Sequence, residues 1–211
     1  MSEKSVWEQY MEKQVEEAIP FFAGSKELED FEFKRHDDFD VSKIVEYVRE
    51  FESEWFIDTS RQELYPIHKH TNTYFVYSYD MDWKPGYVYK PELKCDKPEL
   101  LELVNPIIKR LEEIHDGKVG RCLFIKLAAG KTIEPHSDGG EYLKIGRRHH
   151  IAIITNQKVG FQVGDTTIHM QPGECWEINN TRFHSVWNRG TEDRIHLLVD
   201  IIPTQWLKLN D

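Results

Sequence analysis

The sequence has few cysteines, no long apolar run and no excess of positive charge. Its three cysteines, at positions 95, 122 and 175, are too few and too far apart for a disulfide framework or a thiolate zinc site. Its uncharged apolar runs span only a few residues, whereas a membrane helix needs about 20. The first residues also lack the apolar core of a signal peptide. These absences predict a soluble, cytoplasmic protein with no membrane partner.

The charge balance is acidic. Lysine and arginine together number 27 against 37 aspartate and glutamate, which gives a formal net charge of −10. A chain of this charge has no general electrostatic attraction to nucleic acid, so we expect no nucleic-acid partner. A length of 211 residues with 39% hydrophobic residues suits one domain, 1–211, with a single sizeable core.

The first half of the chain, residues 1–118, has mainly helical patterns and is predicted to support a β-rich catalytic core over 119–203. Capping residues and apolar stripes at helical spacing predict three helices, and an aromatic, β-branched run predicts one strand. Asp40 and Asp96 are the predicted caps of the second and third helices, and Pro106 is expected to bend or split the third. The predicted helices cover about 5–18, 40–54 and 98–116, and the strand covers 73–79.

The second half is predicted to form short strands separated by Gly, Asn and Asp turns. Seven strands at such spacing predict a sandwich or barrel. We therefore expect a mainly β, α+β fold: a double-stranded β-helix, or cupin-like jelly roll, braced by the N-terminal helices. The predicted strands cover 121–128, 148–154, 159–163, 166–170, 174–178, 184–188 and 194–201.

The motif His136-x-Asp138 places an imidazole and a carboxylate on one side of an extended segment. The motif alone is unspecific, because a chain of this composition contains about one copy by chance, and His36-x-Asp38 is a second copy. The copy at 136–138 differs from the other copy because two suitable residues follow it, namely His184 at the start of a later strand and Arg194 ten residues beyond His184. Two imidazoles and one carboxylate on one face of an iron are the ligands of non-haem Fe(II) oxygenases.

Strand alternation puts Arg194, His196, Leu198 and Asp200 on one face of the last strand. A buried arginine needs an anionic partner, so we expect a ligand carboxylate in the pocket.

Two other groups of histidines are not predicted to bind a metal. His36 is interpreted as part of a solvated turn, and His68-Lys69-His70 as an exposed strand end or loop.

From about Leu123 to Pro203 the sequence resembles the aspartyl/asparaginyl β-hydroxylase-type family of Fe(II)/2-oxoglutarate-dependent dioxygenases, which includes proline hydroxylase-like members. The resemblance implies a double-stranded β-helix with catalytic iron bound by His136, Asp138 and His184. It also implies that Arg194 binds the distal carboxylate of 2-oxoglutarate. The motifs that carry it are Ile133-x-Pro135-His136-x-Asp138, Arg148-x-His150-Ile151, Gly173-Glu174-x-Trp176-Glu177-x-Asn179, His184-x-Val186-x-Asn188 and Arg194-x-His196-Leu197-x-x-Asp200.

By the same resemblance, Arg148 and His150 line the cosubstrate or substrate pocket. A register slip of one residue would place Arg147 and His149 there instead. The sequence also departs from part of the family. Asp138 stands where the vertebrate branch keeps glycine, so the chain looks closer to the proline hydroxylase-like and bacterial members. Ile125 stands where the vertebrate branch has a serine that helps to bind 2-oxoglutarate.

The resemblance implies that the protein is an oxygenase that uses Fe(II), 2-oxoglutarate and O₂ and releases succinate and CO₂. The expected substrate is an amino-acid carbon, in an Asp, Asn or Pro residue of a polypeptide or in a free amino acid. Arg147 or Arg148 is a candidate partner for a substrate carboxylate. The alternative is a non-oxygenase, cupin-like metal-binding isomerase or ligand-binding module, which would have no need of Arg194. We make no prediction of an oligomeric state.

Overall fold

The computed structural model describes residues 29–55, 62–63, 65–79 and 89–208, with the side chains of 52–55 excepted. The helix predicted over 5–18 lies outside these residues. The elements in chain order are β1 (Phe33–Asp38), α2 (Ser42–Trp55), η2 (Pro66–His68), β2 (Thr71–Ser78), β3 (Glu92–Leu93), α4 (Pro98–His115), β4 (Gly117–Leu127), β5 (Thr132–His136), α5 (Glu141–Ile145), β6 (Arg147–Ile154), β7 (Val159–Val163), β8 (Thr166–Ile168), β9 (Glu174–Ile178), β10 (His184–Asn188), β11 (Arg194–Pro203) and η3 (Thr204–Trp206).

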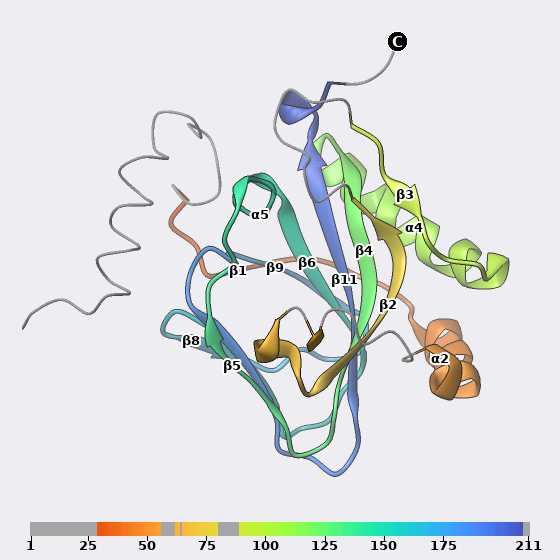
Figure 1. The fold of residues 1–211 in the computed structure, drawn as a ribbon, viewed down its shortest axis with the longest axis vertical. Helices are drawn as coiled ribbons and strands as arrows, with labels where there is room; N and C mark the ends of the chain where they lie inside the picture. Colours follow the sequence, from red (N-terminus) through yellow and green to blue (C-terminus); the bar gives the residue numbers. More distant parts are fainter. Residues whose placement is uncertain (1–28, 56–61, 64, 80–88, 209–211) are drawn as a thin grey trace, which may run out of the picture.

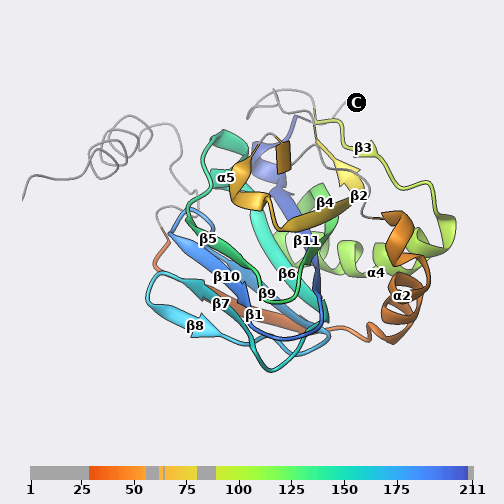
Figure 2. The same ribbon diagram turned by 60° about the horizontal axis from the view of Figure 1, so that its bottom comes forward.

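The strands form two antiparallel sheets (Figures 1 and 2). The large sheet has the order β1-β9-β6-β11-β4-β2-β3, and the small sheet has the order β5-β10-β7-β8. A buried apolar cluster lies between them and includes Leu127, Ala152, Phe161 and Val186. The predicted jelly-roll fold, mainly β with bracing helices, is therefore confirmed.

Helices α2 and α4 cover the other face of the large sheet (Figure 1). Ile195, Leu197 and Val199 of β11 point into this helix-covered core. The alternate residue Leu198 packs with Ile125 on the opposite face. The predicted alternation of the last strand is thus confirmed, and it assigns the even-numbered residues of β11 to the side where the two sheets meet.

The helix boundaries follow local chemistry. Asp40 was predicted to cap α2, and its Oδ1 does accept a hydrogen bond of 3.0 Å from the Ser42 backbone N–H. The first hydrogen bond of the helix runs to Val41 O, however, so Asp40 lies one residue before the cap position. The prediction for α4 was wrong in detail, because its N-cap is Lys97 with no side-chain cap, and not Asp96. Pro106 lies inside α4, which continues without a break from Pro98 to His115. In the described part of the chain, no helix is long and apolar enough to span a bilayer.

Three strands were missed by the sequence patterns, namely β1, β5 and the two-residue strand β3. β5 precedes Asp138 and carries His136, and β1 pairs with β9 at the edge of the large sheet. The prediction of a solvated turn at His36 was wrong, because His36 lies within β1. The run Phe33–Asp38 contains mostly charged residues and lacks the apolar alternation from which a strand is recognised.

Candidate active site

The small sheet brings His136 and His184 together. His136 ends β5, His184 begins β10, and the two residues pair directly across the strands. Their ring centroids lie 4.3 Å apart. Asp138 follows β5 by two residues, and its backbone N–H donates to Asn180 O at 2.9 Å. One ligand atom from each of the three side chains lies within 4.8 Å of the others, so the group has the geometry of a metal site.

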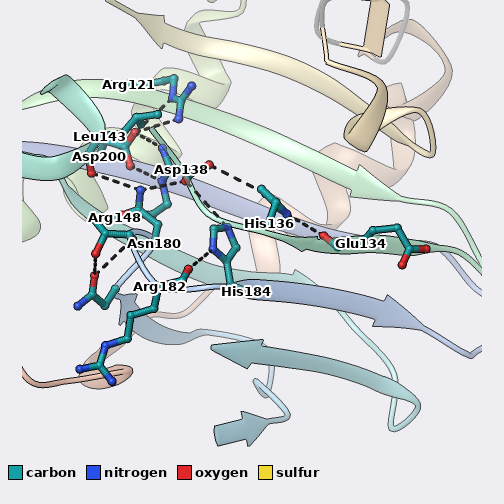
Figure 3. A network of polar contacts seen from close by, with 12 residues as sticks. Arg121, Glu134, His136, Asp138, Leu143, Arg148, Asn180, Arg182, His184 and Asp200 are labelled. Carbon is teal, nitrogen blue, oxygen red and sulfur yellow. Dashed lines mark hydrogen bonds and ion pairs between the residues drawn. The ribbon is translucent and has the colours of Figure 1, made fainter. Parts of the chain in front are cut away.

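The hydrogen bonds of the two imidazoles fix which ring nitrogen faces Asp138. His136 Nδ1 lies 2.8 Å from Glu134 O, and His184 Nδ1 lies 3.0 Å from Arg182 O. A carbonyl oxygen only accepts, so each Nδ1 carries the proton that it donates, which leaves Nε2 of each ring on the side of Asp138. The Nε2 atoms lie 4.0 Å and 3.9 Å from the two Asp138 oxygens (Figure 3). Metal-binding histidines commonly have this arrangement.

Asp138 is held as a carboxylate. Burial alone would raise the pKa of Asp138, but the adjacent Arg148 guanidinium, together with the other positive groups around the carboxylate, outweighs this effect and holds the pKa well below the ordinary value. Asn180 Nδ2 donates to the same carboxylate oxygen, Oδ2, at 2.9 Å. Burial lowers the pKa of His184 to about 4, so this ring is neutral at pH 7. Asp138 and His184 are therefore in the protonation states that a cation requires.

Arg148 is itself held by a second carboxylate. Its Nε and Nη2 donate to the two oxygens of Asp200 at 2.8 Å and 2.9 Å, while Nη1 contacts Asp138 (Figure 3). Burial tends to lower the pKa of Arg148, but Asp200 and Asp138 raise it above the ordinary value. Arg121 also contacts Asp200, at 3.2 Å. This chain of charges fixes the orientation of Asp138.

Arg194, the first residue of β11, is in a different situation. It is 1% exposed, and its Nε and Nη2 atoms have no hydrogen-bond partner among the described residues. Its guanidinium carbon lies 5.9 Å from the centre of the Phe161 ring. Burial lowers the pKa of Arg194 to about 9, which still leaves a cation at neutral pH. A buried cation without an anion is costly, so this side chain is suited to bind one.

Arg194 and the three metal-binding candidates line one cavity. Its remaining walls are mainly apolar, and its lining residues are His68, Ile125, Ile133, His136, Asp138, Arg148, His150, Phe161, His184, Val186, Arg194 and Leu198. All six residues singled out in the sequence for iron, cosubstrate or substrate binding are among them. Their chemical roles remain predictions.

Strand β6 presents Arg148 and His150 to the cavity. These two residues line it, whereas Arg147 bonds Glu177 and Glu29 on the other side of the strand. Each guanidinium is thus already paired with carboxylates. The structure therefore does not favour either arginine as the partner of a substrate carboxylate.

Sequence reasoning missed several residues of the site. His68 was placed on an exposed strand end, but it is buried in the short helix η2 and its ring lies 5.8 Å from that of His136. Asp200 and Asn180 were assigned no part, although they orient Arg148 and Asp138. The inward alternation of β11 was the available signal for Asp200. No local pattern could have found His68, because only the fold brings it to the cavity.

Comparisons with known proteins identify the family and the fold. The family model of aspartyl/asparaginyl beta-hydroxylase matches residues 54–203. An oxidoreductase of the 2OG-Fe(II) oxygenase family from Burkholderia pseudomallei is 10% identical and has a TM-score of 0.56, with 99% of this chain and 97% of that chain covered. The viral collagen prolyl hydroxylase of Paramecium Bursaria Chlorella virus-1, solved with 2OG, is 8% identical and has a TM-score of 0.52, with 82% and 96% covered. At these identities the two structures show a shared fold.

The family match covers most of the chain, so the protein belongs to the aspartyl/asparaginyl β-hydroxylase family. It is accordingly a 2-oxoglutarate-dependent, non-haem iron dioxygenase of the hydroxylase type. This assignment favours the oxygenase over the alternative of a cupin-like isomerase or ligand-binding module.

The residues present fit the two groups that this class requires. Iron(II) takes imidazole and carboxylate ligands, and His136, Asp138 and His184 offer two imidazoles and one ionised carboxylate. A dicarboxylate needs a cation at its far end, and the unpartnered nitrogens of Arg194 supply one in the same cavity.

Proposed function

We propose that this enzyme hydroxylates a carbon atom of an amino acid, either in an Asp, Asn or Pro residue of a polypeptide or in a free amino acid. In this proposal His136, Asp138 and His184 bind iron, and Arg194 binds the distal carboxylate of 2-oxoglutarate. The observation that carries it is the buried Arg194 guanidinium, whose Nε and Nη2 have no hydrogen-bond partner among the described residues and which lines the same cavity as the three metal-binding candidates.

Iron and 2-oxoglutarate, once bound, supply the oxidising chemistry, in which O₂ is consumed, succinate and CO₂ are released and a substrate C–H bond becomes C–OH. The protein binds and orients these groups. Arg148 and Asn180 fix the Asp138 carboxylate, and the carbonyls of Glu134 and Arg182 fix the two imidazole rings. Substitution of a residue that hydrogen-bonds a metal ligand typically lowers metal affinity or activity by about 10–100-fold.

Thr73 is the candidate for the hydroxyl that is absent at Ile125. Thr73 on β2 pairs directly with Ile125 on β4, so both side chains lie on the same face of the sheet. Thr73 is 1% exposed, and its Oγ1 has no hydrogen-bond partner among the described residues. The hydroxyl is therefore available to help Arg194 hold a carboxylate, which a valine at this position could not do.

His150 and the apolar walls complete the proposed cosubstrate site. His150 Nδ1 is buried and, in the described part of the chain, has no hydrogen-bond partner, so it is free to bond a ligand oxygen. Ile125, Phe161 and Leu198 exclude water from the space between Arg194 and the metal-binding candidates. In such a low-dielectric space, the ion pair between Arg194 and a carboxylate is stronger than in water.

Succinate release tests the proposal. The iron-loaded enzyme is incubated with 2-oxoglutarate and either peptides containing Asp, Asn or Pro or the free amino acids, and succinate and the substrate mass are measured. We expect substrate-dependent succinate and a mass gain of one oxygen atom on one amino acid. Succinate formation stimulated only by a compound that is not an amino acid or peptide would contradict the substrate class while leaving the cofactor assignment intact.

A further inference from the structure

A second group of metal-binding side chains lies outside the cavity. His36, His115, His149 and Glu177 each place one ligand atom within 4.8 Å of the others. We call this group the His₃Glu cluster. His149 and Glu177 pair directly across β6 and β9, while His36 comes from β1 and His115 from the last residue of α4. Four elements far apart in the sequence therefore converge on one point.

The cluster lies on the face of the large sheet opposite the cavity. His149 shares its side of β6 with Ile151 and Ile153, which pack in the helix-covered core, whereas His150 lines the cavity. His149 is fully buried, Glu177 is 1% exposed, and the His36 side chain is 16% exposed. The cluster is thus separate from the proposed iron site and is reached from the surface past His36.

The outer atoms of the cluster already have partners. His149 Nδ1 lies 3.2 Å from Val199 O, so Nδ1 carries the proton and the lone pair of Nε2 faces the cluster. Glu177 Oε1 accepts from Arg147 at 3.1 Å, which leaves Oε2 on the inner side. Metal-binding histidines and carboxylates typically have such second contacts, which orient the ligand atom.

The inner atoms are close enough to share one ion. His115 Nε2 lies 2.8 Å from His149 Nε2, and His36 Nε2 lies 2.9 Å from Glu177 Oε2. A tetrahedral zinc ion with bonds of about 2.0–2.1 Å separates neighbouring ligand atoms by about 3.3 Å. These two contacts are about half an ångström shorter than that separation, and all four ligand atoms lie within 4.8 Å of one another, so side-chain rotations can bring them around one ion.

We propose that the His₃Glu cluster binds a divalent transition metal ion, zinc, as a structural site. Three imidazoles and one carboxylate suit Zn²⁺, and a set of four protein ligands is typical of structural sites, whereas catalytic sites keep an open position. The ion joins the C-terminal end of α4 and the edge strand β1 to the sheet that carries the active site. It stabilises the fold and takes no part in the oxygenase reaction.

The opposing account is a metal-free hydrogen-bonded network. In that case His115 donates to His149, and His36 donates to Glu177, whose carboxylate also holds Arg147. Burial lowers the pKa of His115 to about 4 and of His149 to about 3, so both rings are neutral and are suited to either account. Metal binding itself has to distinguish them.

The test isolates this cluster by removing the proposed iron ligands. The full chain carrying Asp138→Ala and His184→Ala is stripped with a chelator and then titrated with Zn²⁺ alone, and bound zinc is counted by mass spectrometry. In this background, His36→Gln removes one cluster ligand at a partly exposed position, and His70→Gln is the matched control outside both groups. Titration with Co²⁺ adds a spectroscopic readout, because tetrahedral cobalt absorbs strongly in the visible.

We expect one zinc ion per chain, a tetrahedral cobalt spectrum, and a zinc dissociation constant raised at least tenfold by His36→Gln but not by His70→Gln. Zinc is also expected to raise the melting temperature of the doubly substituted chain. Absence of stoichiometric zinc, or equal zinc affinity in the His36→Gln and His70→Gln variants, would overturn the proposal. His115→Gln provides a second variant. If this variant folded and bound zinc with unchanged affinity, the proposal would also be overturned.

Discussion

His149 and His150 are neighbours on β6, yet they belong to different clusters on opposite faces of the sheet. His149 pairs with Glu177 in the His₃Glu cluster, and His150 lines the cavity with Arg194. The alternation of a strand by two residues produces this division. One strand therefore connects the proposed structural metal site to the proposed oxygenase site, and each can be tested with substitutions that leave the other side chains in place.

Replacement of Arg194 should stabilise the ligand-free protein and at the same time weaken the binding of 2-oxoglutarate. Because its cation is buried and its Nε and Nη2 are unpartnered, Arg194→Met should raise the free energy of unfolding of the ligand-free protein by about 1–3 kcal/mol. The same change should weaken 2-oxoglutarate binding by about 30- to 1,000-fold, as expected for a lost buried charge pair. Urea denaturation and equilibrium binding measure the two effects.

Arg189→Met is the matched control, because Arg189 lies at the surface over Trp187 and away from the cavity. It should leave both quantities nearly unchanged. If Arg194→Met destabilised the ligand-free protein and bound 2-oxoglutarate as the unaltered enzyme does, Arg194 would be a structural residue.

Removal of the Asp200 charge should impair the metal site without touching a ligand. Asp200→Asn breaks the paired hydrogen bonds that hold Arg148, leaving a buried cation that is no longer balanced. The free energy of unfolding should fall by about 3–5 kcal/mol. Iron affinity should fall by about 10–100-fold, because Arg148 no longer fixes the Asp138 carboxylate.

Asp165→Asn, an exposed substitution in the turn before β8, should change neither stability nor iron affinity. Isothermal titration with Fe(II) under anaerobic conditions and urea denaturation provide the measurements. Unaltered iron affinity in a folded Asp200→Asn variant would show that Arg148 does not orient Asp138.

The metal-free protein should lose stability as the pH falls from about 6.5 toward 4. Burial lowers the pKa of His184 to about 4 and that of His196 well below its ordinary value. The unfolded chain takes up protons at these residues near pH 6.5, whereas the folded chain does not, so stability is retained above this pH and lost below it. Each such histidine contributes at most about 1.4 kcal/mol per pH unit.

The window from pH 6.5 to 5 isolates the histidines. Burial tends to raise the pKa of Glu177, but the neighbouring His36 and Arg147 help to lower it to about 2. Glu177 therefore loses its contribution to stability only below about pH 4.5. His196→Gln should reduce the slope of unfolding free energy against pH in chelated protein. A flat profile over this window in the unaltered protein would contradict the neutral, buried state of these rings.

Gly160 should be sensitive to a single added methyl group. A Cβ at this position would lie 2.2 Å from the Trp187 ring, which packs across the β7–β10 pair. Gly160→Ala therefore displaces the indole and should cost about 1–3 kcal/mol of unfolding free energy. Gly139→Ala is the control, since nothing lies within 4 Å of its Cβ. Equal melting temperatures of the two variants would show that the ring moves without cost.

Strand alternation and turn residues were sufficient to predict the β-rich half. Each strand predicted from residue 121 onward exists, with ends that differ by a few residues. Apart from the exposed β8, these strands are largely buried, so the hydrophobic pattern identifies them, and turn residues on either side mark β8. The inward face of Arg194 could be anticipated because the side chains of β11 follow that alternation, whereas the pairing of His136 with His184 could not, because no pattern predicted β5.

The remaining features depend on contacts distant in sequence. His36 and His115 are polar residues with no distinguishing pattern in their own segments, and only the packing of β1 and α4 on the sheet brings them to His149. His68 likewise reaches the cavity through the position of η2. A charged edge strand such as β1 has no apolar alternation, so its pairing partner β9 determines its structure.

The central claim is that His136, Asp138, His184 and Arg194 together bind Fe(II) and 2-oxoglutarate, and anaerobic absorption spectroscopy tests it most directly. Fe(II) and then 2-oxoglutarate are added to the metal-free enzyme, with Asp138→Ala, Arg194→Met and Arg189→Met measured in parallel. The account predicts the weak visible charge-transfer band of an iron-chelated 2-keto acid in the unaltered enzyme and in Arg189→Met, and its loss or weakening in the other two. An unaltered enzyme that binds iron but gives no band, or an undiminished band in both Asp138→Ala and Arg194→Met, would contradict it.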